Sequence, residues 1–151
     1  MTIQRLPTVR EFMDKYVDTL SPETDIWDAV DFLLEKRVTG APVADSKGKL
    51  VGILTESDCL KLLTLGGADH EAPKGKVKDF MTSAVESIPP TMDIYYVAGL
   101  FLTKNFRRLP VVEDGRIVGA ITQFDILRAV QRGLAGLTNS PSGARELAGV
   151  A

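Results

Sequence analysis

Two short stretches of this chain share one pattern, "GILTESD" from Gly52 to Asp58 and "GAITQFD" from Gly119 to Asp125. Each consists of a glycine, two apolar residues, a threonine, two variable residues and an aspartate. The agreement extends outward, because "VREFM" at Val9 matches "VKDFM" at Val77 in the same register, with one gap at Lys47. A chance match would not keep its register over such a length. The chain is therefore an internal duplication.

Both halves predict the same order of elements: a short helical turn, a strand, a helix, a two-stranded hairpin and a closing helix. Prolines follow the first strand in each half. Thr24 is the expected N-cap of the helix that follows, with Asp25 in its first turn. Asp114–Gly115 indicates a tight hairpin. The expected turns, first strands and closing helices are 9–13, 17–20 and 56–65 in the first half, and 77–81, 85–88 and 123–132 in the second.

Composition narrows the class of protein. Of the 151 residues, 44% are hydrophobic, which suits a packed core and not a disordered chain. A net charge of -2 gives no reason to expect a nucleic-acid or acidic-lipid partner. The longest apolar run, Tyr95–Leu102, is too short to cross a bilayer, and the N-terminus lacks the apolar stretch of a signal peptide. We therefore expect a cytoplasmic protein with no membrane partner.

The ordered set of elements, the "RVTGAPV" stretch from Arg37 to Val43 and the Gly-x-x-Thr-x-x-Asp ending resemble a CBS domain. Two in tandem resemble a stand-alone CBS pair, often called a Bateman module. The resemblance covers Val9 to about Gly133. It implies an α/β (α+β) fold of two β-α-β-β-α units related by a pseudo-two-fold axis. The expected boundaries are unit 1 at 1–66 (core 9–66), a linker at 67–76, unit 2 at 77–133 and a flexible tail at 134–151.

The resemblance also implies a function. CBS pairs are regulatory modules without catalysis of their own, which bind adenosine-containing ligands in clefts between the units and signal by conformational or assembly change. We expect AMP, ADP or ATP as the ligand, with S-adenosylmethionine possible and no cofactor required. Family modules commonly pair into disc-like dimers, so a homodimer with an unidentified regulated protein as partner is expected.

The repeated motif has its own physical case for a nucleotide site. Thr55 and Thr122 fall where a strand ends and a helix begins, and helix N-termini favour phosphate or ribose oxygens. An ionised aspartate only accepts hydrogen bonds, which suits two adjacent ribose hydroxyls. The glycine of the motif would let a ligand or another backbone come close. However, Thr-x-x-Asp is also nearly a capping box, which would need no ligand. The two roles are compatible.

Carried over by position, the resemblance implies two unlike clefts. One combines Thr55 and Asp58 with Ser87, Phe106, Arg108 and Leu109; the other combines Thr122 and Asp125 with Thr19, Val38, Thr39 and Ala41. Phe106 and Val38 would contact adenine, and Arg108 would bind a phosphate with two donors. The counterpart of Arg108 is Gly40, which cannot. The Asp58 cleft is therefore expected to prefer a phosphorylated adenosine, and the Asp125 cleft to bind more weakly or take a less charged ligand.

Other interpretations stay open. Arg107 and Arg108 could be an exposed surface pair. The chain could be a ligand-independent dimerisation or scaffolding module in which Asp58 and Asp125 only cap helices. An enzyme is not expected, because no nucleophile is paired with a base. No metal site is expected at His70, which has no suitably spaced ligand partners, and Cys59, the only cysteine, is expected to be a buried apolar residue.

Overall fold

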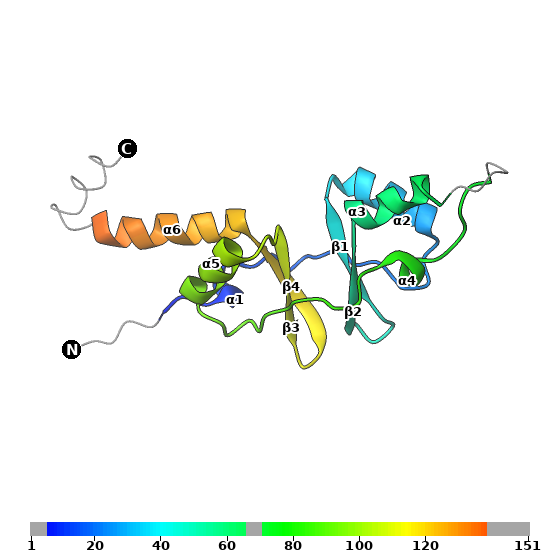
Figure 1. Ribbon diagram of the computed structural model, residues 1–151. Helices are drawn as coiled ribbons and strands as arrows, with labels where there is room; N and C mark the ends of the chain where they lie inside the picture. Colours follow the sequence, from blue (N-terminus) through cyan, green and yellow to red (C-terminus); the bar gives the residue numbers. More distant parts are fainter. Residues whose placement is uncertain (1–5, 66–70, 139–151) are drawn as a thin grey trace.

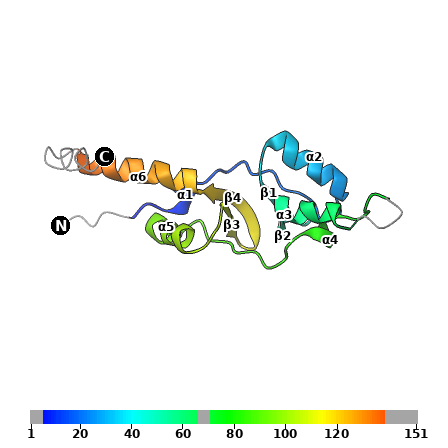
Figure 2. The same ribbon diagram turned by 45° about the horizontal axis from the view of Figure 1, so that its top comes forward.

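The computed structural model describes residues 6–65 and 71–138. The first half contains α1 (Val9–Phe12), α2 (Ile26–Lys36), β1 (Gly40–Ala44), β2 (Leu50–Thr55), α3 (Glu56–Leu60) and the 3₁₀ turn η1 (Lys61–Leu63). The second half contains α4 (Val77–Phe80), α5 (Ile94–Thr103), β3 (Arg108–Glu113), β4 (Arg116–Thr122) and α6 (Gln123–Thr138). The two hairpins occupy the middle of the molecule, with α1, α5 and α6 beyond one and α2, α3 and α4 beyond the other (Figures 1 and 2). The α+β class is confirmed.

Each hairpin is an antiparallel pair, β1 with β2 and β3 with β4. Asp114 and Gly115 both have positive φ, 53° and 79°, which is the backbone of a two-residue type I′ turn. The hairpin ends also contact each other, because the Ile117 N–H donates to the Gly48 carbonyl at 3.1 Å. The two sheets are thereby joined at their tips.

The predicted first strands are wrong in extent. Residues 17–20 and 85–88 pair with the hairpins at only one bridge each, Leu20 with Val43 and Ile88 with Val111, both parallel. Neither ladder continues past its bridge. Pro22 and Pro90 each come two residues after a bridge, at the position whose N–H would make the next bond of a parallel ladder, and a proline has no N–H.

Each of the two short helices, α1 and α4, packs against the core of the opposite half, an exchange of helices between the halves. Val9 of α1 is fully buried in the core of the second half, beside Ile94 and Val97 of α5. Val77 of α4 is likewise buried in the core of the first half, with Ile26 of α2. The exchange is held by backbone hydrogen bonds as well, since the Val77 N–H donates to a carbonyl of the first half at 2.8 Å. Each core therefore contains one short helix of the other half.

Three helix ends differ from prediction. The N-cap of α2 is Asp25 and not Thr24, because the Asp25 carboxylate accepts from the Trp27 N–H at 3.0 Å. The helix expected over 56–65 ends as a 3₁₀ turn at Leu63, shortly before two consecutive glycines. In contrast, α6 continues to Thr138, beyond the expected start of the tail at 134. The rest of the predicted tail lies outside the described residues.

Candidate functional site

The glycine of each motif admits the backbone of the exchanged segment. A Cβ at Gly119 would lie 2.7 Å from the Asp14 carbonyl oxygen, and one at Gly52 would lie 3.0 Å from the Thr82 carbonyl oxygen. Both segments pair with β-strands at these points, since Asp14 and Ala120 exchange two backbone hydrogen bonds of 2.9 and 3.0 Å. Each glycine therefore allows the close approach of a neighbouring backbone that was expected of it.

Both motifs form complete capping boxes. In the first, the Asp58 N–H donates to Thr55 Oγ1 at 3.3 Å, and Asp58 Oδ2 accepts from the Thr55 N–H at 2.9 Å. The second repeats this with Thr122 and Asp125, at 3.2 and 2.9 Å. Asp58 and Asp125 are 5% and 8% exposed, which is low for carboxylates. The capping role is thus present in both halves, and each box uses Oδ2, so any further role depends on Oδ1.

The two Oδ1 atoms have different surroundings. Asp125 Oδ1 accepts from Arg128 Nη2 at 2.8 Å, and the same nitrogen donates to the Phe12 carbonyl at 3.0 Å. Among the described residues, Asp58 Oδ1 has only long contacts, 3.4 Å to Thr82 Oγ1 and 3.6 Å to Lys61 Nζ. The chain itself therefore satisfies Asp125, whereas Asp58 keeps one oxygen that is weakly engaged. Sequence reasoning missed Arg128, although a basic residue three positions after each aspartate was its visible signal.

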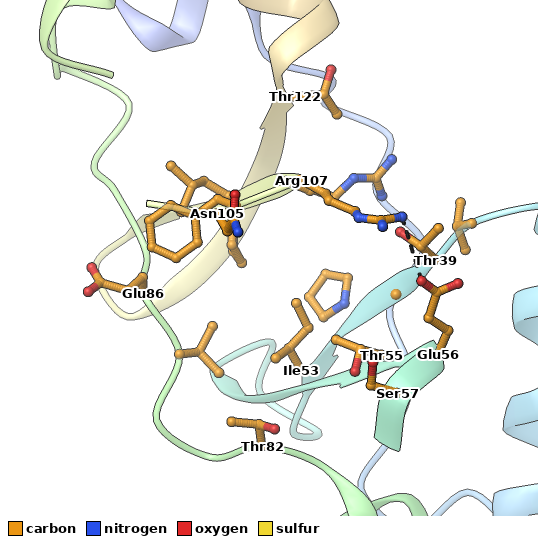
Figure 3. A pocket seen from close by; sticks show the side chains of 18 of the residues that line it. Thr39, Ile53, Thr55, Glu56, Ser57, Thr82, Glu86, Asn105, Arg107 and Thr122 are labelled. Carbon is orange, nitrogen blue, oxygen red and sulfur yellow. Dashed lines mark ion pairs between the residues drawn. The ribbon is translucent and has the colours of Figure 1, made fainter. Parts of the chain in front are cut away.

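A cavity of about 610 Å³ lies between the two halves. Thr55, Glu56 and Ser57 approach it from one side, and Asn105 and Arg107 approach it from the other (Figure 3). Four residues predicted for the first cleft line it: Thr55, Phe106, Arg108 and Leu109. Three predicted for the second cleft line this same cavity: Val38, Thr39 and Thr122. These seven residues, predicted for two clefts, thus line one continuous cavity between the β1–β2 and β3–β4 hairpins.

Five predicted residues are not among those that line this cavity: Asp58, Ser87, Thr19, Ala41 and Asp125. Ala41 is 2% exposed and belongs to the core of the first half. Asp58 lies behind the wall, where its Oδ1 contacts Thr82, a residue that does line the cavity. Position along the predicted first strands could not tell residues that line the cavity from residues of the core. These segments pair at a single bridge each, so their side chains do not alternate regularly between two faces of a sheet.

The charges around the cavity favour an anion. Arg37, Arg107 and Arg108 line it together with two carboxylates, those of Glu56 and Glu86. Arg107 Nη1 lies 3.6 Å from Glu56 Oε1, whereas Arg37 and Arg108 have no ion-pair partner among the residues described. Unpaired guanidinium groups suit phosphate, which they bind through two parallel hydrogen bonds. Sequence reasoning missed Arg37, which caps the C-terminus of α2 with a φ of 54°.

The remaining predictions concern metal binding, membrane helices and the reactivity of Cys59. Within residues 6–65 and 71–138 no three metal-ligating side chains come together, and His70 lies outside these residues. No described helix combines the length and the apolar character needed to cross a membrane. Cys59 is partly exposed rather than buried, and its desolvation raises the pKa of the thiol, with the nearby Asp58 carboxylate adding to the rise. A raised pKa keeps the thiol protonated and unreactive.

The sequence matches a family model described as the CBS domain at residues 9–65 and 77–132. A relative from Methanocaldococcus jannaschii, the uncharacterized protein MJ1225, is 35% identical over 120 residues, which cover 80% of this chain and 41% of that protein. An inosine-5'-monophosphate dehydrogenase from the same organism is 32% identical over 127 residues, which cover 83% of this chain and 24% of the enzyme. The chain thus spans less than half the length of either relative, and CBS domains also occur as parts of enzymes.

Two solved structures share the fold. CBSX2 in complex with AMP has a TM-score of 0.71 and 34% identity, over 83% of this chain and 96% of that one. The CBS domain pair of protein MJ0100, in complex with 5'-methylthioadenosine and S-adenosyl-L-methionine, has a TM-score of 0.69 and 28% identity, over 85% and 99%. Together with the two matched segments, these similarities show that the chain belongs to the CBS domain family and carries two such domains in tandem.

Proposed function

We propose that this chain is a non-catalytic regulatory module that binds an adenosine phosphate in the cavity between its two CBS units. The observation that carries the proposal is that one cavity combines Thr55 of the repeated motif with Phe106 and Arg108 of the other unit. An apolar ring, a hydroxyl and a guanidinium with no ion-pair partner among the described residues match the base, the ribose and the phosphate of such a ligand. The two related structures whose ligands are adenosine compounds support the same class.

Each part of the ligand has a candidate partner. Phe106 is partly buried against the core of the second half, so its remaining face can contact adenine. Arg108 and Arg37 come from opposite units and would bind phosphate from two sides. Asp58 Oδ1 would accept from a ribose hydroxyl once the Thr82 hydroxyl, 3.4 Å away, turns aside. Three guanidinium groups and two carboxylates line the cavity, and this excess of positive charge favours adenosine phosphates over S-adenosylmethionine, whose sulfonium is positive.

The Asp125 motif is proposed to bind ligand weakly or not at all. Its carboxylate already accepts from the Thr122 N–H and from Arg128. A ribose hydroxyl would have to displace a charge-assisted hydrogen bond, the stronger kind. We therefore expect one ligand per chain, which calorimetric stoichiometry measures directly.

The test is a melting curve and a calorimetric titration with adenosine, AMP, ADP, ATP and S-adenosylmethionine. Ligand at about 100 times its dissociation constant stabilises the folded state by roughly 2.7 kcal/mol, or about 5–11 °C in Tm for a chain of this size. Arg108→Gln should lower AMP affinity about 10-fold or more, since a hydrogen bond to a charged group contributes about 1.5–3 kcal/mol.

The matched control is Arg116→Gln, which removes the same charge from an exposed residue that does not line the cavity. Equal AMP affinity in Arg108→Gln and the control would exclude Arg108 as a phosphate ligand. Absence of binding by every adenosine compound would exclude the proposed function.

A second candidate is ligand-independent dimerisation or scaffolding. It is favoured by the complete capping boxes, which give Asp58 and Asp125 a role without ligand, and by exposed apolar side chains on α5 and α6. Leu102 is 87% exposed, Phe124 70% and Leu127 60%. Such side chains fit the homodimer expected for the family. Light scattering and melting curves, each recorded with and without AMP, separate the two candidates. AMP should change the molar mass or the Tm of a regulatory module, and should change neither for a ligand-independent scaffold.

A further inference from the structure

One ion pair reaches across the cavity from unit to unit. Arg107 precedes β3 in the second half, and its Nη1 lies 3.6 Å from Oε1 of Glu56, the first residue of α3 in the first half (Figure 3). Both side chains line the cavity. The backbone of Glu56 is fixed, because its N–H donates to the Thr39 carbonyl at 2.8 Å. The carboxylate is therefore held within reach of any group that binds beside Arg107.

The internal repeat shows that the fold does not require this pair. The counterpart of Glu56 after the second motif is Gln123, and the counterpart of Arg107 is Thr39. Gln123 also occupies the first position of its helix, where its amide donates to the Phe106 carbonyl at 3.3 Å. An uncharged side chain thus occupies this position in the second half. The charges of Glu56 and Arg107 need a reason particular to this side of the cavity.

The pair is easily exchanged. The two side chains are 71% and 56% exposed, for Arg107 and Glu56 respectively, and exposed ion pairs are held only weakly. A phosphate offers Arg107 a stronger, bidentate partner. The other carboxylate of the cavity, Glu86, has its own partner in Lys104 at 3.0 Å. A phosphate that binds Arg107 would therefore have to displace the Glu56 carboxylate from it.

We propose that Glu56 is a specificity-determining residue that competes with the ligand's phosphate for Arg107. The inference rests on the proposed function. Without ligand, Glu56 neutralises Arg107 and bridges the units. With an adenosine phosphate bound, Arg107 contacts the phosphate, and the released carboxylate repels it. Glu56 thus weakens the binding of each ligand in proportion to its negative charge, and adenosine itself is unaffected.

Glu56→Gln tests this with adenosine, AMP and ATP, titrated calorimetrically at low ionic strength. Glutamine is chosen because Gln123 shows that the position accepts it. We expect adenosine affinity to stay unchanged, AMP affinity to rise about 2- to 5-fold, and ATP affinity to rise further, in keeping with the weak energy of an exposed pair. The rise should shrink at high salt, because salt screens exposed charges. Arg107→Gln should lower AMP affinity and leave adenosine affinity unchanged.

Glu113→Gln is the matched control. It removes one negative charge from an exposed residue that pairs with Arg10 and does not line the cavity. An equal gain in Glu113→Gln would mean that only net charge matters, and would overturn the inference. The inference would also be overturned if Glu56→Gln raised the affinity for adenosine as much as that for AMP, because the pair would then only hold the two units together. It would be overturned as well if Glu56→Gln did not raise AMP affinity at all. If wild type and variants bind no adenosine compound, the proposed function fails and this inference with it; if wild type binds AMP, the inference stands or falls alone.

Discussion

The two aspartates of the repeated motif should respond differently to replacement by asparagine. In the second half, an amide group at position 125 must set its NH₂ either against Arg128 or against the Thr122 N–H, both of which are donors. In the first half, the NH₂ can take the place of Asp58 Oδ1. There it faces the Thr82 hydroxyl, which can rotate to accept, and Lys61, whose side chain is 61% exposed and free to move away. Asp125→Asn should therefore destabilise the fold more than Asp58→Asn.

The magnitude follows from the bonds that are lost. A hydrogen bond to a charged group contributes about 1.5–3 kcal/mol, and the half-exposed Arg128 places this one at the lower end. The Arg128 guanidinium also keeps its bond to the Phe12 carbonyl, 3.0 Å away. We expect Asp125→Asn to lower the free energy of unfolding by about 1–2 kcal/mol more than Asp58→Asn. For a chain of this size that difference is about 2–8 °C in Tm.

Urea unfolding of the single variants measures the difference, and a double-mutant cycle of Asp125→Asn with Arg128→Met assigns it to the pair. The two substitutions should be non-additive, because each removes the same contact. Asp58→Asn paired with Lys61→Met is the matched control and should be additive within about 0.5 kcal/mol. If Asp58→Asn destabilises as much as Asp125→Asn, or if the second cycle couples as strongly as the first, the distinction drawn between the two carboxylates is refuted.

Two further predictions concern the packing between the halves. Gly119→Ala should destabilise by about 1–3 kcal/mol, typical of overpacking, and by more than Gly52→Ala. The nearest atom to a Cβ at Gly119 is a backbone carbonyl oxygen at 2.7 Å, whereas at Gly52 it is the flexible Met81 thioether; equal urea midpoints would contradict this. Glu23→Gln tests the contact between α4 and the first half. Hydrogen bonds from Lys76 and then Lys78 lower the pKa of Glu23 below its ordinary value of 4.5. A lowered pKa stabilises the fold above the ordinary value, and this is lost as pH falls through the folded-state pKa. The urea midpoint of wild type should therefore exceed that of Glu23→Gln at pH 7, and the difference should shrink as pH falls below 4.5; a difference of unchanged size in acid would refute the charge-based cause.

Local sequence patterns determine much of this fold. The duplication follows from motifs that recur in one register, and Asp114–Gly115 forms the predicted tight turn. The Thr-x-x-Asp spacing predicted a capping box, and both halves contain one. These features depend on residues within a few positions of one another, so the sequence determines them alone.

The partners of those local elements were decided by tertiary packing. Nothing in "VREFM" or "VKDFM" says that each helix packs against the other half, because the same apolar residues would fit either core. The same holds for the site. The exchange brings the Thr82 backbone against β2, and the facing sheets gather Thr55, Arg108 and Thr122 around one cavity. Contacts between distant residues depend on which surfaces bury together, whereas periodicity reports only which face of each element is apolar. The sequence by itself therefore determined the two units and their capped motifs, and only the tertiary structure decided that Asp58 keeps a weakly engaged oxygen while Arg128 holds Asp125.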